Sequence, residues 1–201
     1  KRASAEMIRS AKFCKKFMDM RPKSLGDSPI PPTITGFTGS SIWKYLYSFP
    51  PVTKGMIEAG FDVILQASNH TLDVGVRGIE NCIDYWKKQK GITYLGINES
   101  QAEKDDIKIV EKNGIRFALL NYTYGLNGHI LPKDKSYLVN LINTALIIKD
   151  LQKAEQIADF TIVFPHWGVE YVYKPNKHQK NLARIMTENG ADLIITEDWG
   201  F

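Results

Sequence analysis

The apolar positions along the chain fall into short runs of strand length, and stretches with helical spacing separate these runs. This alternation is typical of an α/β fold, and it predicts a mostly parallel central sheet. The expected elements from Pro51 onward are a short helix ending at Gly60, a strand 61–66, a helix near 76–89, a strand 92–95, two strands 107–110 and 115–120, a helix 144–157, a strand 160–165, a helix 177–188 and a strand 191–195.

One antiparallel pair interrupts the parallel pattern. The apolar stretches 107–110 and 115–120 flank Lys112-Asn113-Gly114, and an Asn-Gly pair readily supplies the positive φ angles of a tight turn. We therefore expect a β-hairpin here. At the other end of the core, Asn176 is placed to cap the helix 177–188, and Gly190 is placed to end it.

The first 50 residues have a different character. Apolar residues recur at helical spacing over 3–20, from Met7 to Met18, which predicts an amphipathic helix, basic on its other faces. Residues 21–50 are rich in Pro, Gly and Ser and predict a long loop. The chain is thus expected to form a single domain over 1–201, with its α/β core at 51–195.

The positive charge of the chain is concentrated at its N-terminus. The net charge of +4 comes from the N-terminus, because residues 1–23 hold eight Lys and Arg against Glu6 and Asp19. Such a cluster fits an anionic polymer or a membrane surface, or is a solvated helix face. With 201 residues and 43% apolar content the chain needs neither metal nor disulfides to fold, and Cys14 and Cys82 are expected to be unreactive buried thiols.

No apolar run reaches the roughly 18 residues of a membrane span. The sequence begins at Lys1 without a methionine, so an export signal or anchor is expected, if present, before this residue. No nucleic-acid partner is expected.

The first candidate site follows the predicted strand 61–66 and reads Ala67-Ser68-Asn69-His70-Thr71-Leu72-Asp73. An Asn carbonyl is a neutral hard metal ligand, and the adjacent imidazole can protonate a leaving group or bind the metal. Asp73 is close enough to orient that ring. It could equally cap the next helix in a purely structural turn.

The second candidate site follows the predicted strand 160–165. A strand this apolar is covered on both faces, so His166 is the first polar side chain to emerge at the crevice, unless it is a structural histidine. Trp167 and Tyr171 pack the loop or contact a sugar or an acyl chain. Glu170 is a surface acid in a salt bridge or orients a neighbouring group.

A third polar loop, 121–129, contains Tyr124 and Asn127 as candidate substrate contacts, and its glycines permit close approach of a ligand. His129 is expected to be exposed. Because the strands before the first two loops end at one sheet edge, the imidazoles of His70 and His166 are expected within about 10 Å of each other.

Several ordered motifs together resemble the bacterial capsule-synthesis proteins of the CapA, or poly-γ-glutamate, type, whose fold is related to the calcineurin-like metallophosphoesterases. The resemblance runs from about Ser48 to Ile195. It is carried by Glu58-Ala-Gly-Phe-Asp62, Ala67-Ser-Asn-His-Thr-Leu-Asp73, Tyr122-Thr-Tyr-Gly-Leu-Asn-Gly128, His166-Trp-Gly-Val-Glu-Tyr171, Gln179 with Leu182-Ala183, and Gly190-Ala-Asp-Leu-Ile-Ile195.

The resemblance implies a metallophosphoesterase-like layered α/β core with a divalent metal ion at the strand ends. Asn69 and His166 would be metal ligands, and His70 would be the general acid or a further ligand. Such a site would activate water for attack on a phosphoester or an amide. The implied partners are an anionic polymer such as poly-γ-glutamate or capsule material, and other capsule-synthesis proteins. The implied location is the cell envelope or the extracellular side, secreted or anchored through a segment outside this chain.

The sequence departs from the family pattern in two places. The family opens with a strand that ends in Gly-Asp, whereas Gly26-Asp27 here has no strand before it, and where the family continues into Gly-His-x-His this sequence reads residues 196–201. Either the missing motifs lie outside this sequence or the metal centre is degenerate. Weak metal binding is therefore expected, with Asp27, Glu197 and Asp198 as further candidate ligands. The alternatives are a non-catalytic polymer-binding or anchoring subunit with a degenerate site and, less favoured, a generic phosphatase or nucleotidase.

Overall fold

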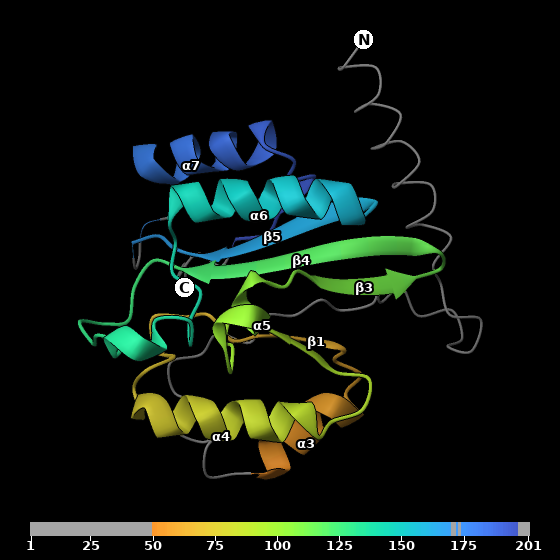
Figure 1. The fold of residues 1–201 in the computed structure, drawn as a ribbon, viewed down its shortest axis with the longest axis vertical. Helices are drawn as coiled ribbons and strands as arrows, with labels where there is room; N and C mark the ends of the chain where they lie inside the picture. Colours follow the sequence, from red (N-terminus) through yellow and green to blue (C-terminus); the bar gives the residue numbers. More distant parts are fainter. Residues whose placement is uncertain (1–49, 170–171, 173, 197–201) are drawn as a thin grey trace. The chain divides into compact units, whose positions relative to one another are not determined.

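The structure is a computed structural model that describes residues 50–169, 172 and 174–196 (Figure 1). The described residues belong to one compact unit. The predicted helix 3–20, nearly all of the loop 21–50 and Cys14 lie outside the described residues. Those expectations, and that of one domain over 1–201, stay predictions.

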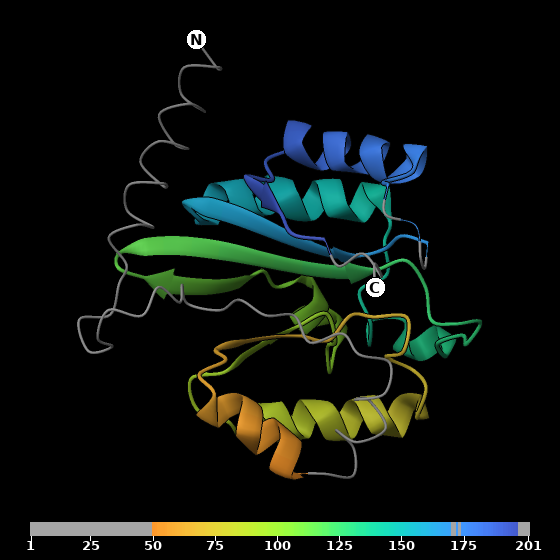
Figure 2. The same ribbon diagram turned by 180° about the vertical axis from the view of Figure 1, so that it is seen from behind.

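A two-stranded parallel sheet forms the first half of the described fold. β1 (Val63–Leu65) pairs with β2 (Thr93–Leu95), preceded by α3 (Pro50–Glu58) and connected by α4 (Gly75–Lys87). Both helices lie on the same side of this sheet (Figures 1 and 2). Their apolar core includes Met56, Ile64, Leu72, Ile79, Cys82, Ile83, Trp86 and Tyr94.

A four-stranded sheet forms the second half, in the order β3 (Lys108–Lys112), β4 (Ile115–Thr123), β5 (Phe160–His166) and β6 (Leu193–Ile194). The β3–β4 hairpin is antiparallel and turns at Asn113, whose φ is 53°, while β4–β5 and β5–β6 are parallel.

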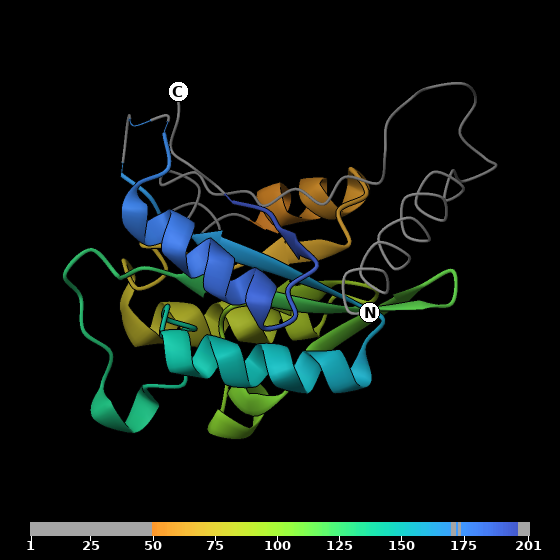
Figure 3. The same ribbon diagram turned by 90° about the horizontal axis from the view of Figure 1, so that it is seen from above.

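Two helices, α6 (Thr144–Ile157) and α7 (Lys177–Glu188), make the crossovers of this sheet and lie side by side on one face (Figures 1 and 3). The core between these helices and the sheet includes Ala118, Leu120, Tyr122, Ile147, Leu151, Val163, Leu182 and Met186. Apolar side chains spaced along one face of each helix are what fix it on the sheet.

The alternation of side chains along β4 and β5 decides which polar groups face the first sheet. Leu120 and Tyr122 of β4, and Val163 of β5, belong to the core under α6 and α7. Successive strand residues point to opposite faces. Asn121 of β4 and His166 at the end of β5 therefore point to the side of β1 and β2.

Asn121 connects the two sheets through its side chain. Its Oδ1 atom accepts hydrogen bonds from the backbone nitrogens of Gln66 (3.2 Å) and Ala67 (2.8 Å), and its Nδ2 atom donates to the carbonyl of Phe164 (2.8 Å). Gly96 lies against this junction with φ +91°, and a Cβ there would come within 2.3 Å of Asn121 Oδ1. The close approach of the strands thus requires glycine at this position.

A backbone segment at 138–142 completes the junction at the carboxyl ends of the strands. The carbonyl of Leu138 accepts from Asn98 N (3.1 Å), and Asn140 N donates to Gly96 O (2.9 Å). On the other side of the segment, Asn140 O accepts a hydrogen bond from Thr123 N (2.9 Å), and Ile142 N donates to the carbonyl of Thr123 (2.8 Å). One extended segment therefore pairs with both sheets.

The predicted class, α/β with mostly parallel strands and one hairpin, is confirmed, and α6 and α7 begin and end where the sequence predicted. The strands are divided between two hydrogen-bonded sheets. Two short elements were not predicted, α5 (Gln101–Asp105), which Ser100 caps, and a 3₁₀ turn at Lys133–Lys135. No helix within the described ranges is long and apolar enough to cross a membrane.

Candidate functional site

A buried hydroxyl shapes the turn that follows β1. Thr71 is 1% exposed, and its Oγ1 atom donates to the carbonyl of Gln66 (2.7 Å) while accepting from Ser68 N (2.8 Å). Asn69 and His70 lie between these anchors. The fold thereby holds both side chains at the carboxyl end of β1, where ligands bind in open α/β sheets.

Asn69 and His166 meet across the two sheets. His166 Nε2 lies 2.9 Å from Asn69 Oδ1, and both residues are buried, at 2% and 4% exposure. The other end of the Asn69 amide, Nδ2, donates to Asn127 Oδ1 at 2.9 Å. A carboxamide oxygen only accepts, so in this arrangement His166 Nε2 is the donor.

His70 lies beside this pair. Its Nδ1 atom is 2.8 Å from Asp73 Oδ2 and 3.2 Å from Asn127 Nδ2. The position before α4 is held by Val74, which makes no capping hydrogen bond from its side chain. Asp73 is therefore not the N-cap of α4, and its carboxylate contacts the imidazole of His70.

Tyr124 covers His166 from the solvent side. The two rings stack with centroids 6.1 Å apart and planes at 16°, and Tyr124 N donates to His166 O at 3.0 Å. Tyr124 is 53% exposed. An exposed aromatic face next to buried polar groups suits contact with an apolar part of a substrate.

The structure brings six of the predicted site residues together, namely Asn69, His70, Asp73, Tyr124, Asn127 and His166. Trp167 requires a correction as a substrate contact, because it is 5% exposed and packs in the core under α6 and α7. It lies four residues after Val163 and shares that inward face. Glu170 and Tyr171 lie outside the described residues, as do Asp27, Glu197 and Asp198.

Asn69 Oδ1 and His166 Nε2 are atoms of the types that ligate divalent metal ions, and they lie 2.9 Å apart, at hydrogen-bond distance. To bind an ion together with Asn69 Oδ1, His166 Nε2 would first give up the proton that it donates in this arrangement. Among the described residues, no three His, Cys, Asp or Glu side chains cluster as a metal site would need. The described residues therefore fit part of a ligand set.

Two residues that hold the site together were not identified from the sequence. Thr71 fixes the turn that carries Asn69 and His70, and Asn121 ties that turn to β4. The signal for Asn121 is a polar side chain inside the apolar run 117–122. A buried amide in such a run needs partners for both of its ends.

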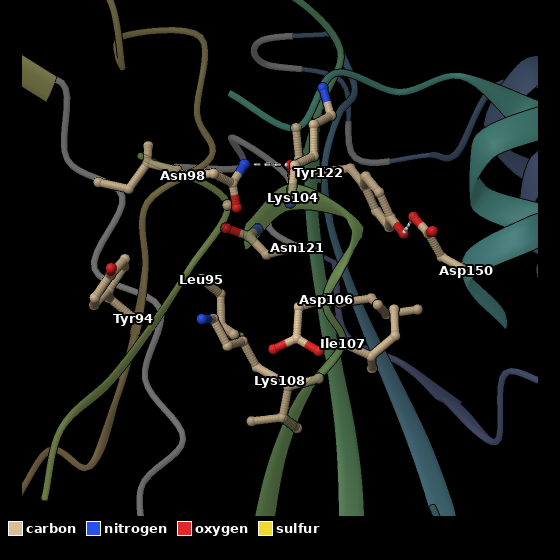
Figure 4. A pocket seen from close by; sticks show the side chains of 15 residues that line it. Tyr94, Leu95, Asn98, Lys104, Asp106, Ile107, Lys108, Asn121, Tyr122 and Asp150 are labelled. Atoms are coloured by element: carbon tan, nitrogen blue, oxygen red, sulfur yellow. Dashed lines mark hydrogen bonds between the residues drawn. The ribbon is translucent and has the colours of Figure 1, made fainter. Parts of the chain in front are cut away.

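A separate small polar cavity lies between β2 and β4 (Figure 4). Its volume of about 20 Å³ suits one water molecule and no larger ligand. On its wall Tyr122 Oη donates to Asp150 Oδ2 at 2.8 Å. Burial, together with the Asp150 charge, raises the pKa of Tyr122 well above its ordinary value, and burial also raises the pKa of Asp150.

Lys104 lines the same cavity. Burial lowers its pKa, and its Nζ atom donates to the carbonyl of Ser136 at 3.1 Å. The cationic group is thus engaged in holding the loop that precedes 138–142. This cavity contributes to the packing of the two sheets, and neither His70 nor His166 lines it.

Comparison with known proteins gives consistent results. Residues 33–198 match the family model described as bacterial capsule synthesis protein PGA_cap. The chain is 33% identical to the capsule biosynthesis protein CapA of Bacillus anthracis over 147 residues, which cover 71% of this chain and 35% of that protein. It is 32% identical to the PGA biosynthesis protein CapA of Bacillus subtilis strain 168 over 143 residues, which cover 71% of this chain and 37% of that protein.

The chain spans about a third of the length of these curated relatives. Its structure is similar to that of a Staphylococcus aureus protein described as a candidate 5′-nucleotidase, solved with α-ketoglutarate. The TM-score is 0.53 at 16% identity, and the match covers 78% of this chain and 32% of that one. This likeness confirms the predicted fold, an α/β fold of the calcineurin-like metallophosphoesterase type. The family match covers most of the chain, and the protein belongs to the bacterial capsule synthesis protein PGA_cap family.

Proposed function

We propose that the crevice at His70 and His166 is a metal-dependent hydrolase site that serves the synthesis of a capsule polymer such as poly-γ-glutamate. One observation carries the proposal. A pair of buried ligand atoms, Asn69 Oδ1 and His166 Nε2, lies 2.9 Å apart beside an imidazole that a carboxylate orients. The bond class is a phosphoester or an amide.

Asn69 and His166 would hold the ion. The bound ion would lower the pKa of a coordinated water and so generate a nucleophile near neutral pH. Because both side chains are buried, water does not compete with an ion for their ligand atoms. The turn fixed by Thr71 and the end of β5 are both parts of the sheet scaffold, which suits ligands that must stay in place.

His70 is the proposed general acid. Because its Nδ1 atom contacts Asp73, its Nε2 atom is the one left to hold a proton for a departing oxygen or nitrogen. Asp73 accepts from Nδ1–H, so the form of His70 that donates from Nε2 is the imidazolium with both ring nitrogens protonated, and the carboxylate holds that ring in place. Tyr124 and Asn127 are both exposed at the crevice and are the proposed substrate contacts.

The cellular setting rests on the relatives, which are named for capsule and PGA biosynthesis. We place the protein at the cell envelope or on the extracellular side, secreted or anchored through a segment outside this chain. Its proposed partners are the anionic polymer and other capsule-synthesis proteins. The basic residues 1–23 are the proposed contact with that polymer, because opposite charges attract over a Debye length of about 8–10 Å.

The test combines cation binding with hydrolysis. Mn²⁺ affinity is measured by titration calorimetry, and hydrolysis is followed with chromogenic phosphomonoester, phosphodiester and γ-glutamyl amide substrates. We expect His166→Ala to abolish measurable Mn²⁺ binding. We expect His70→Ala to retain Mn²⁺ and to slow hydrolysis by about 10²-fold or more, the usual contribution of a general acid. The control is His178→Ala, an exposed histidine on α7.

The outcomes separate the two candidate functions. Mn²⁺ binding that His166→Ala leaves unchanged would overturn the proposed metal site. If the wild-type protein hydrolyses none of the substrates but binds polyglutamate in a salt-sensitive way, the non-catalytic polymer-binding alternative is the better account.

A further inference from the structure

Two carboxamides stand between the two imidazoles of the crevice. From one end to the other, His166 Nε2 lies 2.9 Å from Asn69 Oδ1, and Asn69 Nδ2 donates to Asn127 Oδ1 at 2.9 Å. Asn127 Nδ2 in turn lies 3.2 Å from His70 Nδ1. Asn127 is thus the residue that contacts both Asn69 and His70 from the loop after β4.

The orientation of the Asn69 amide decides whether it can bind a cation. A carboxamide has one end that accepts and another that donates. With Nδ2 satisfied by Asn127, the Oδ1 end of Asn69 points to His166. A half-turn of the amide would place an NH₂ group beside His166 instead, and an amide NH₂ does not ligate a metal.

The Nδ2 atom of Asn69 is buried and depends on Asn127 for a hydrogen-bond acceptor. The residue is 4% exposed, and among the described residues Asn127 Oδ1 accepts a hydrogen bond from its Nδ2 atom. A buried N–H without an acceptor is costly, so the acceptor that is present selects the orientation.

The backbone conformation at Asn127 places its side-chain oxygen close to Asn69. Its φ is +49°, in the left-handed region, and Gly128 follows with φ +81°. Asn and Asp tolerate this region better than other side chains, and glycine adopts it freely. The loop therefore turns back toward β1 at the residue whose amide reaches Asn69.

We propose that Asn127 is a positioning residue, whose side-chain oxygen keeps the Asn69 carbonyl oxygen directed toward His166 and so toward a divalent cation. This positioning role is additional to the substrate contact proposed for Asn127 above. The cation part of this inference rests on the proposed function, whereas the orientation of Asn69 is independent of it.

Two substitutions separate the oxygen acceptor from the backbone. Asn127→Gly keeps the left-handed conformation and removes the acceptor. Asn127→Asp keeps an oxygen for Asn69 Nδ2. The matched control is Asn113→Gly at the hairpin turn, where φ is 53° and the same change leaves the crevice untouched.

The first readout needs no metal. The exchange of the Asn69 side-chain NH₂ protons with solvent is followed by ¹⁵N NMR on the full chain, with the resonance assigned from its loss in Asn69→Asp. We expect slow exchange in the wild type, in Asn127→Asp and in Asn113→Gly, and at least about tenfold faster exchange in Asn127→Gly. Wild-type exchange in Asn127→Gly would overturn the proposal.

The second readout is Mn²⁺ affinity by calorimetry in the absence of substrate. Loss of a residue that orients a metal ligand weakens binding by about 10- to 100-fold, and we expect this for Asn127→Gly but not for Asn127→Asp. Unchanged affinity in Asn127→Gly would confine Asn127 to substrate contact and overturn the proposal. If the wild type binds no Mn²⁺, the proposed function fails, and the NMR result alone decides the role of Asn127.

Discussion

The side-chain oxygen of Asn121 lies 2.8 Å from the backbone nitrogen of Ala67, two residues before Asn69. Through this contact the four-stranded sheet fixes the start of the loop that carries the proposed site. The buried amide of Asn121 therefore helps to set the position of Asn69 relative to His166.

Replacing this amide should destabilise the protein strongly. Asn121→Ala removes the acceptor for Gln66 N and Ala67 N and the donor to Phe164 O, all buried. We expect the free energy of unfolding, measured by urea denaturation, to fall by about 3 kcal/mol. Asn181→Ala, on the exposed face of α7, should change it by less than about 0.5 kcal/mol. Equal effects of the two substitutions would contradict the role of Asn121.

Two glycines with similar backbone angles should respond differently to alanine. Gly91 has φ +79° and nothing within 4 Å of an added Cβ, so Gly91→Ala should cost about 1 kcal/mol for the backbone conformation alone. Gly96 has φ +91°, and an added Cβ would lie 2.5 Å from Ala67 N and 2.3 Å from Asn121 Oδ1. Gly96→Ala should lower the thermal midpoint far more, or prevent folding. If Gly91→Ala and Gly96→Ala had similar thermal midpoints, the two sheets would be able to move apart at Gly96 without a large loss of stability.

The carboxylate of Glu103 should make stability depend on acid pH. Burial alone would raise its pKa, but hydrogen bonds from Glu99 N, Tyr94 Oη and Lys108 Nζ outweigh burial and lower the pKa below its ordinary value of 4.5. A lowered pKa means that the stabilisation is present above that value and is lost as the pH falls through the folded-state pKa.

Glu103→Gln should therefore be less stable than the wild type near neutral pH, by about 1–2 kcal/mol. The difference in unfolding free energy should shrink as denaturation is repeated at progressively lower pH. Glu188→Gln removes a carboxylate from an exposed ion pair with Arg184 and should show no such trend. A constant difference across the acid range would disprove the assignment to Glu103.

The start of α6 offers a test of local stability. Asn143 accepts hydrogen bonds from Ala145 N at 3.0 Å and Leu146 N at 3.1 Å. Asn143→Ala should cost about 1 kcal/mol, and Asn143→Ser, which restores a good capping side chain, should recover most of it. Chemical denaturation of the three proteins checks the order, and an alanine variant as stable as the serine variant would rule out the cap.

How far the sequence predicts the structure depends on the range of the interactions. α6 and α7 were predicted to the residue, because apolar spacing and caps such as Asn176 are local signals. α5 is only five residues long and has no buried residue, so its apolar pattern carries no signal, although Ser100 and Glu103 form a capping pattern.

The candidate site was predictable in part. The polar residues after β1 and β5 could be found, because they follow apolar runs. The contacts of Asn121 span 43 to 55 positions along the chain, and no local pattern encodes them. The inward position of Trp167 was available from the alternation that begins in β5, yet its aromatic character suggested a substrate contact instead.

The segment 138–142 has a consequence for how the protein unfolds. Because it pairs with 96–98 on one side and with Thr123 on the other, the two sheets can separate there only if one of these two sets of backbone hydrogen bonds breaks. Local openings of a fold follow contiguous cooperative units. The amide proton of Asn140 is bonded to Gly96 O and that of Ile142 to Thr123 O, so their rates of exchange with deuterium should report which of the two sheets releases the segment first.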